Sequence, residues 1–288
     1  MSKTRGKFFV KLVAMKKVFF ILLAAMFVFG GCHRADMQNY AEILGSELPL
    51  ADTKGEIHFS TTLSHIPTVK YKIQNEEIFF VVDSASVSNW FLGTKAVRKV
   101  VPEDLYRASK IVHTTILTYF TDNLLFLLDP NYRYSAVLKN SPYDGFLGLA
   151  YLEQYKNVVF DYQNNTITFN QEPICDNELP LYKNQTQNMW YTTFECNGVS
   201  SNVLVDTGCF SVFVNKANVK STVGEDEIIN VRLGNVEING ISIAANKTLI
   251  TNEDAKNGIY KNENILGYPC FKDHVIQLDF EHNKFRIK

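Results

Sequence analysis

Apolar residues alternate with polar ones, or gather into short apolar runs, along most of the chain. Val69, Tyr71 and Ile73 alternate with polar residues, which is the period-two pattern of a half-buried β-strand. Residues 78–82 form a continuous apolar run that stops at Asp83, as expected of a fully buried strand. Similar runs, separated by Asn, Asp and Gly, continue through the rest of the sequence, and only residues 94–110 favour short helices. The pattern predicts an all-β protein.

Three landmarks occur twice in the same order, so the chain contains an internal repeat. The first is an apolar strand that ends in Asp, the second is an apolar pair followed by Gly, and the third is an Asp-led turn between two strands. The copies are residues 80–85 and 203–208, residues 145–149 and 264–268, and residues 159–167 and 277–285.

The spacing of the landmarks agrees between the copies. Gly148 follows Asp83 by 65 residues, and Gly267 follows Asp206 by 61 residues. We therefore expect two duplicated β-lobes, joined in the polar, strand-poor segment at residues 171–180, which contains two prolines. The predicted lobes are residues 56–172 and residues 173–288. The repeated Asp161 and Asp279 belong to turn sequences, and we expect both to be structural.

The first 32 residues differ from the rest of the chain. They contain six Lys or Arg and no acidic residue, and an apolar run at residues 18–29 is too short to span a bilayer but fits a signal peptide. The following Gly-Gly-Cys resembles a bacterial lipobox, which implies cleavage before Cys32 and lipid on its sulfur. The alternative is an ordinary secretory peptide followed by a chance cysteine. Residues 33–55 are polar and irregular, as in a tether. We expect an exported protein of the cell envelope, anchored by lipid to the outer membrane or on the periplasmic face.

Charge excludes one class of partner. Residues 33–288 contain 23 basic and 30 acidic residues, a net charge of −7, whereas the whole chain carries −1. So acidic a chain lacks the basic surface that binds nucleic acid.

The cysteines and histidines do not predict a metal site. Four cysteines follow residue 32, no two of them in Cys-x-x-Cys spacing, and the six histidines show no ligand spacing either. We expect no metal and no cofactor. An exported chain can form disulfides, and four cysteines allow three pairings, among which sequence alone cannot choose.

The repeated landmarks resemble those of the aspartic proteases. That family carries an apolar strand ending in Asp-Thr/Ser-Gly, followed some sixty residues later by two hydrophobic residues and Gly. Two copies in one chain are similar to the pepsin type, and one copy would imply a retropepsin-type homodimer. The resemblance covers about residues 66–288. It implies a monomer with two pseudo-symmetric, six-stranded-type β-barrel lobes and a cleft that takes a peptide or protein substrate.

The resemblance also assigns roles to single residues. Asp83 and Asp206 would be the catalytic pair of an aspartic-type endopeptidase, because two close carboxylates share one proton and supply both a base and an acid. The other positions would support the two loops. Ser84 and Thr207 would bond across between the loops, Ala85 and Gly208 would let the loops approach, and Gly148 and Gly267 would let a neighbouring strand pass close by.

The sequence departs from the family pattern in two places. Ala85 stands where the family has Gly, and any left-handed conformation there would cost about 1–2 kcal/mol. The family also closes a Gly-tipped hairpin over its substrate, but no Gly lies between Gly93 and Gly145. Residues 116–120 and 124–128 predict a hairpin in that interval with Tyr119 near its tip, and Gly224 is the matching candidate in the second lobe.

Two function classes therefore stay open. The chain is either a peptidase or a non-catalytic envelope lipoprotein that holds a peptide or protein partner between its lobes, and an undistorted loop at Ala85 together with a closable hairpin favours the enzyme. A Cys209 nucleophile is a weaker reading, because no base can be identified beside it.

If the loops adjoin as the family implies, Cys209 could pair with Cys270, leaving Cys175 with Cys196.

Overall fold

The computed structural model describes residues 55–61, 65–73, 75–101, 103, 116–121, 124–129, 143–214, 228–242 and 264–288. The predicted signal peptide with Cys32, the tether up to residue 54, and Gly224 lie outside the described residues. Within the described ranges, no helix is both long and apolar enough to cross a membrane.

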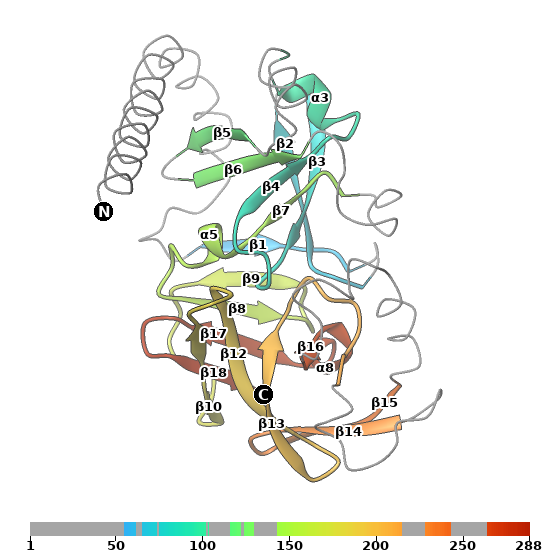
Figure 1. Cartoon of the computed structure of the whole chain (residues 1–288), viewed down its shortest axis with the longest axis vertical. Helices are drawn as coiled ribbons and strands as arrows, with labels where there is room; N and C mark the ends of the chain where they lie inside the picture. Colours follow the sequence, from blue (N-terminus) through green and yellow to red (C-terminus); the bar gives the residue numbers. More distant parts are fainter. Residues whose placement is uncertain are drawn as a thin grey trace, which may run out of the picture.

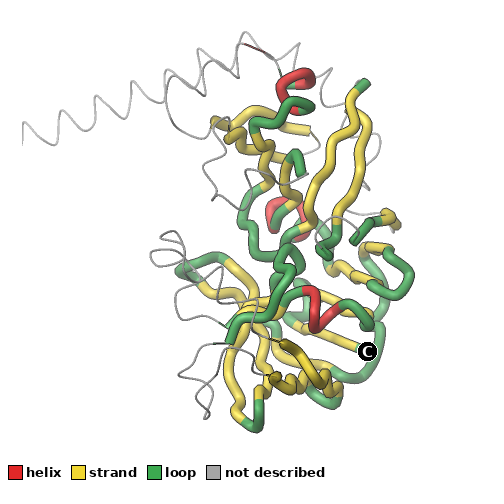
Figure 2. Tube along the Cα trace, turned by 90° about the vertical axis from the view of Figure 1, so that its right-hand side faces the viewer, coloured by secondary structure: helices red, strands yellow, loops and turns green. Residues whose placement is uncertain are grey.

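The described chain is built mainly of β-strands, which confirms the all-β prediction. The strands form three six-stranded sheets (Figure 1). Two of the sheets are each confined to one half of the chain, and the third draws strands from both halves. The predicted closed barrels are wrong for the described residues, because each sheet is open and ends in edge strands. The helices are one turn long and lie between strands (Figure 2).

The first-lobe sheet contains strands from residues 68–147. Its β7 lies between β3 and β4, parallel to β3 and antiparallel to β4. The predicted hairpin is confirmed as the antiparallel pair β5–β6, although its turn at residues 122–123 is outside the described residues. The order across the sheet is β2 (Thr68–Ile73), β3 (Glu76–Val82), β7 (Gly145–Leu147), β4 (Asn89–Leu92), β6 (Leu124–Asp129) and β5 (Ile116–Thr121).

The second-lobe sheet repeats the central part of this arrangement. Its β13 ends at Val205 and runs parallel to β16, as β3 runs parallel to β7 in the first lobe. The order is β15 (Val236–Ser242), β14 (Ile228–Leu233), β12 (Met189–Cys196), β13 (Val199–Val205) and β16 (Ile265–Leu266), with β11 (Tyr182–Asn184) also paired to β12.

The shared sheet joins the two lobes and lies between them (Figure 1). Three strands come from each half, and the antiparallel pair β8–β17 forms its centre. Sequence reasoning did not predict this sheet as a unit, and it missed β10 inside the expected linker. The order is β1 (Glu56–His58), β9 (Thr166–Phe169), β8 (Asn157–Asp161), β17 (Val275–Asp279), β18 (Lys284–Ile287) and β10 (Glu178–Pro180).

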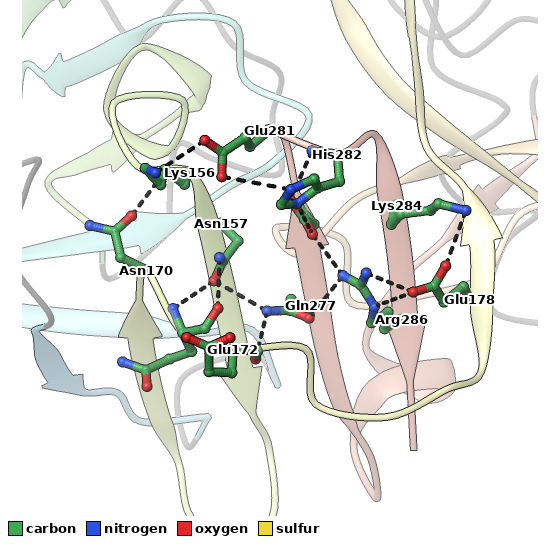
Figure 3. A network of polar contacts seen from close by, with 12 residues as sticks. Lys156, Asn157, Asn170, Glu172, Glu178, Gln277, Glu281, His282, Lys284 and Arg286 are labelled. Carbon is green, nitrogen blue, oxygen red and sulfur yellow. Dashed lines mark hydrogen bonds and ion pairs between the residues drawn. The ribbon is translucent and has the colours of Figure 1, made fainter.

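One face of the shared sheet is apolar and buried, and it carries the core between the lobes. Phe160, Leu278 and Phe285 are fully buried members of this core. The alternate positions point to the other face and carry a polar network (Figure 3). There Arg286 binds Asp279 at 2.8 Å, and the Gln277 amide donates to Asn157 Oδ1 at 3.2 Å.

The repeated Asp residues are structural, as predicted. Asp161 Oδ1 accepts the backbone N–H groups of Gln163 and Asn164 at 3.0 and 2.9 Å, and thereby closes the β8–β9 turn. Asp279 Oδ1 accepts the N–H of His282 at 3.0 Å in the matching β17–β18 turn.

Three short helices complete the described chain. The helix α3 (Val97–Val100) lies within the segment predicted to be helical. The helices α5 (Leu149–Leu152) and α8 (Tyr268–Phe271) begin directly after Gly148 and Gly267, so they extend the internal repeat.

Candidate active site

The two repeated Asp residues lie at equivalent strand ends. Asp83 follows β3, and its backbone N–H donates to the Leu147 carbonyl on the parallel strand β7 at 2.9 Å. Asp206 follows β13, and its N–H donates to the Leu266 carbonyl on β16 at 3.0 Å. Each loop therefore leaves its sheet under the same constraint, from a strand that lies beside the repeated apolar pair.

A reciprocal set of hydrogen bonds locks the two loops together. The Ser84 N–H donates to Thr207 Oγ1, and the Thr207 N–H donates to Ser84 Oγ, both at 3.0 Å. Each hydroxyl then donates to the carbonyl before the opposite Asp, Ser84 to Val205 and Thr207 to Val82, both at 2.7 Å. Both side chains are fully buried. These four bonds are the contacts predicted for Ser84 and Thr207.

The loops bring the two carboxyl groups into direct contact. The side chains of Asp83 and Asp206 share a hydrogen bond. Asp83 Oδ1 also accepts the N–H groups of Ala85 at 2.8 Å and Ser86 at 3.1 Å. A Cβ on Gly208 would lie 2.6 Å from Asp83 Cγ, so the close approach requires a glycine there.

Burial raises the pKa of both carboxyl groups. For Asp83, desolvation outweighs the hydrogen bonds that favour the ionised form. For Asp206, desolvation and the nearby charge of Asp83 together raise the pKa well above its ordinary value. Asp83 is partly exposed, whereas Asp206 is 5% exposed. The pair can therefore hold one proton over a wide pH range.

Ala85 fits its loop without strain. It is not among the non-glycine residues with positive φ, so the cost of a left-handed conformation does not arise. Its side chain is 5% exposed and packs in an apolar cluster with second-lobe residues. These are Met189, Tyr191, Leu204 and Ile265.

The repeated glycines let the following chain pass beside each Asp loop. A Cβ on Gly148 would lie 2.4 Å from the Ser86 carbonyl oxygen, and one on Gly267 would lie 2.2 Å from the Ser211 carbonyl oxygen. The next residues use this approach, since Leu149 N–H donates to Ser86 at 2.7 Å and Tyr268 N–H donates to Cys209 at 2.8 Å. Both glycines therefore hold the place that the sequence predicted.

Contacts away from the loops also tie the lobes together, and sequence reasoning missed them. Glu153, at the end of α5, accepts bonds from Lys183 Nζ at 2.6 and 2.8 Å and from Trp190 Nε1 at 2.6 Å. His65 stacks on Tyr268 with ring centroids 5.3 Å apart. Apart from Tyr268, none of these residues belongs to a repeated motif, so the sequence carried no signal for the contacts.

The described cysteines are all free thiols, so both predicted pairings are wrong. Cys196 and Cys270 are buried, and Cys175 is half-buried with its sulfur 3.4 Å from the Ile287 carbonyl oxygen. Burial and the neighbouring Asp206 raise the pKa of the Cys209 thiol well above its ordinary value, which keeps the thiol protonated. A protonated thiol is a poor nucleophile, which weakens the alternative of cysteine catalysis.

The flap residues stay predictions. Tyr119 lies on β5, paired with Phe126 of β6, but its side chain is outside the described part of the structure.

A scan against the models of known protein families and a search of curated proteins both gave no match.

Proposed function

We propose that the protein is an aspartic-type endopeptidase of the bilobal, pepsin/retropepsin-like kind, with Asp83 and Asp206 as its catalytic pair. The observation that carries the proposal is the reciprocal bonding of Ser84 and Thr207. Those bonds hold two loops from different lobes back to back and leave their carboxyl groups hydrogen-bonded to each other. Two Asp residues that only form turns would not need hydrogen bonds between their loops.

The chemistry follows from the shared proton. The ionised carboxylate takes a proton from water as the water attacks the peptide carbonyl carbon, and the protonated carboxyl group donates to the carbonyl oxygen. Fixed geometry supplies much of the rate, because both groups must act on one water and one carbonyl. Asp206 Oδ1 is buried and has no hydrogen-bond partner among the described residues, so an acceptor is left for the reacting water.

The alternative is a non-catalytic lipoprotein that holds a peptide between the lobes. Ala85 was the sequence feature that favoured it, because a strained first loop would misplace Asp83. The unstrained, buried Ala85 removes that support. In the proposal, the substrate is an extended peptide or protein segment of the cell envelope, and lipid on Cys32 holds the enzyme at a membrane.

The test is cleavage of a peptide library by the detergent-solubilised full chain, from acidic to neutral pH. Asp83→Asn and Asp206→Asn should each remove nearly all cleavage, and the double variant should be little worse, because the pair acts as a unit. Matching circular dichroism spectra would show that the variants keep the fold. Cleavage at the full rate by Asp206→Asn protein would refute the proposal.

A further inference from the structure

Glu153, directly after the short helix α5, bonds to two side chains of the opposite lobe. Its carboxylate accepts Lys183 Nζ at 2.6 and 2.8 Å and the Trp190 indole N–H at 2.6 Å. Lys183 lies on β11 and Trp190 on β12, and the Lys183 ammonium is 5.5 Å from the centre of the Trp190 ring. An ionised acceptor makes these bonds stronger than bonds between neutral groups. We call this set of bonds the Glu153 contact.

On the first-lobe side, backbone hydrogen bonds connect the Glu153 contact to the Asp83 loop. The Glu153 N–H donates to the Leu149 carbonyl at 2.9 Å, and the Leu149 N–H donates to the Ser86 carbonyl at 2.7 Å. The Ser86 N–H in turn donates to Asp83 Oδ1 at 3.1 Å. A shift of α5 would therefore move one of the N–H groups that fix the Asp83 carboxyl group.

On the second-lobe side, the Glu153 contact reaches the strand beside the one that leads to Asp206. Trp190 directly precedes Tyr191, and Tyr191 pairs with Leu204 of β13. That strand ends one residue before Asp206. The Glu153 contact therefore links the supports of both Asp residues by a route separate from the hydrogen bonds between the loops.

The second copy of the repeat forms the same helix without an equivalent carboxylate. Lys272 holds the position of Glu153, and its N–H donates to the Tyr268 carbonyl at 2.9 Å, while the Tyr268 N–H donates to the Cys209 carbonyl at 2.8 Å. The Lys272 ammonium lies 3.7 Å from the adjacent Asp273, and both side chains are exposed. The helix and its bond to the Asp loop thus need no carboxylate at this position. The Glu153 carboxylate serves the relation between the lobes rather than the formation of α5.

We propose that Glu153 is a positioning residue that holds the Asp83 carboxyl group in line with Asp206 through α5 and Ser86. The two carboxyl groups must act on one water and one carbonyl, so a displaced Asp83 lowers the rate of the chemical step. That effect on catalysis rests on the proposed peptidase function. The coupling of Glu153 to the Ser86 N–H does not.

The test is amide hydrogen exchange, read by NMR on the detergent-solubilised full chain. Glu153→Gln keeps the shape of the side chain but removes its charge, so the Ser86 and Leu149 N–H groups should exchange about tenfold faster. The equivalent Tyr268 N–H of the second copy should keep its parent rate. Glu281→Gln is the matched control, because it breaks an exposed ion pair in the β17–β18 turn, and it should change none of these rates.

Kinetics supply a second measurement where peptides are cleaved. Glu153→Gln should lower kcat about tenfold and leave KM within about twofold of the parent value, because alignment of the pair acts in the chemical step. Glu281→Gln should leave both constants unchanged. A raised KM with unchanged kcat in Glu153→Gln would contradict a positioning role.

The exchange rates separate this inference from the proposed function. An unchanged Ser86 rate in Glu153→Gln would overturn the inference, and so would equal acceleration at Ser86 and Tyr268, because that result indicates a general loss of stability. If the parent cleaves no peptide, the proposed function fails, and the exchange rates still decide the coupling. If Glu153→Gln fails to fold, Trp190→Phe is judged by the same criteria, because it removes the indole N–H and keeps an aromatic ring.

Discussion

Thr207 Oγ1 accepts the backbone N–H of Ser84 at 3.0 Å, although 123 residues separate the two positions along the chain. The bond is one of four that cross between the lobes at their closest approach. Its length and burial mean that the carboxyl groups on either side cannot shift independently of each other.

Thr207→Val should therefore damage both stability and cleavage. Valine keeps the shape but leaves the Ser84 N–H and the Val82 carbonyl buried without partners, at about 1–3 kcal/mol for each group. Cleavage should fall about 100-fold, the usual effect of a misplacement of about 1 Å. Thr207→Ser is the matched control, because it retains the hydroxyl. Thermal unfolding and peptide kinetics measure both effects, and equal behaviour of the two variants would show that the bonds are not needed.

Gly148→Ala tests the close approach beside the first loop. The added Cβ would lie 2.4 and 2.5 Å from the carbonyl oxygens of Ser86 and Ser88, so backbone must move. We expect a loss of about 2–4 kcal/mol in unfolding free energy, above the usual range for strain alone. Gly198→Ala is the control, since Gly198 has φ +78° but open space around it, and about 1 kcal/mol should be lost there. Denaturant titration measures both values, and similar losses would contradict the steric argument.

Asp206→Asn should stabilise the protein near neutral pH. The folded-state pKa of Asp206 lies above the ordinary value of 3.8, so between these values the folded state binds more protons than the unfolded state. Stability is then lost as the pH rises through that window. Asparagine cannot ionise, so near pH 7 the unfolding free energy of the variant should be about 1–3 kcal/mol higher than that of the parent, and the variant should melt at higher temperature. The difference should vanish at acid pH.

Melting curves at a series of pH values measure this effect. Asp273→Asn, at a side chain that is 76% exposed, is the control and should change stability by less than about 0.5 kcal/mol. A constant difference between Asp206→Asn and the parent at every pH would contradict the linkage to ionisation.

Arg286→Met tests the polar face of the shared sheet. The Arg286 and Asp279 side chains are 4% and 3% exposed, so the variant removes the arginine from a buried carboxylate that keeps only its contacts with His282. Such a change costs about 3–5 kcal/mol. Lys70→Met breaks the exposed pair with Glu77 and should cost about 0–1 kcal/mol. Denaturant midpoints compare them, and a neutral Arg286→Met would mean that methionine packing replaces the ion pair.

Local pattern and repetition predicted the elements around the site. The alternation of Val69, Tyr71 and Ile73 predicted β2, and the apolar runs on either side of residues 121–123 predicted the β5–β6 hairpin. The repeat and the family resemblance predicted a close approach beside each Asp loop at Gly148 and Gly267, and the structure adds that the strand before each glycine runs parallel to the Asp strand. Both signals are short-range or internal to the sequence, which is why they could be read without a structure.

Contacts that depend on how the lobes meet could not be predicted in the same way. The edge strand β10 is only three residues long and contains a proline, so its segment reads as a linker until the sheet gives it a partner. The cysteine pairings could not be read from the sequence, because a disulfide requires a specific distance and alignment of two side chains. Glu153 looked like any exposed acid, and only the packing of α5 near Trp190 gives it a role.

The shared sheet also sets the order in which the chain can mature. The strand β8 lies at the centre of that sheet and pairs with β17. During synthesis the first half emerges first, and the β8 edge stays unpaired until residues 275–279 have followed. An unpaired, apolar-backed edge is a template for aggregation. Chains halted before β17 should therefore be insoluble or bound by chaperones. The fraction of chains that fold correctly then depends on how soon β17 pairs with β8.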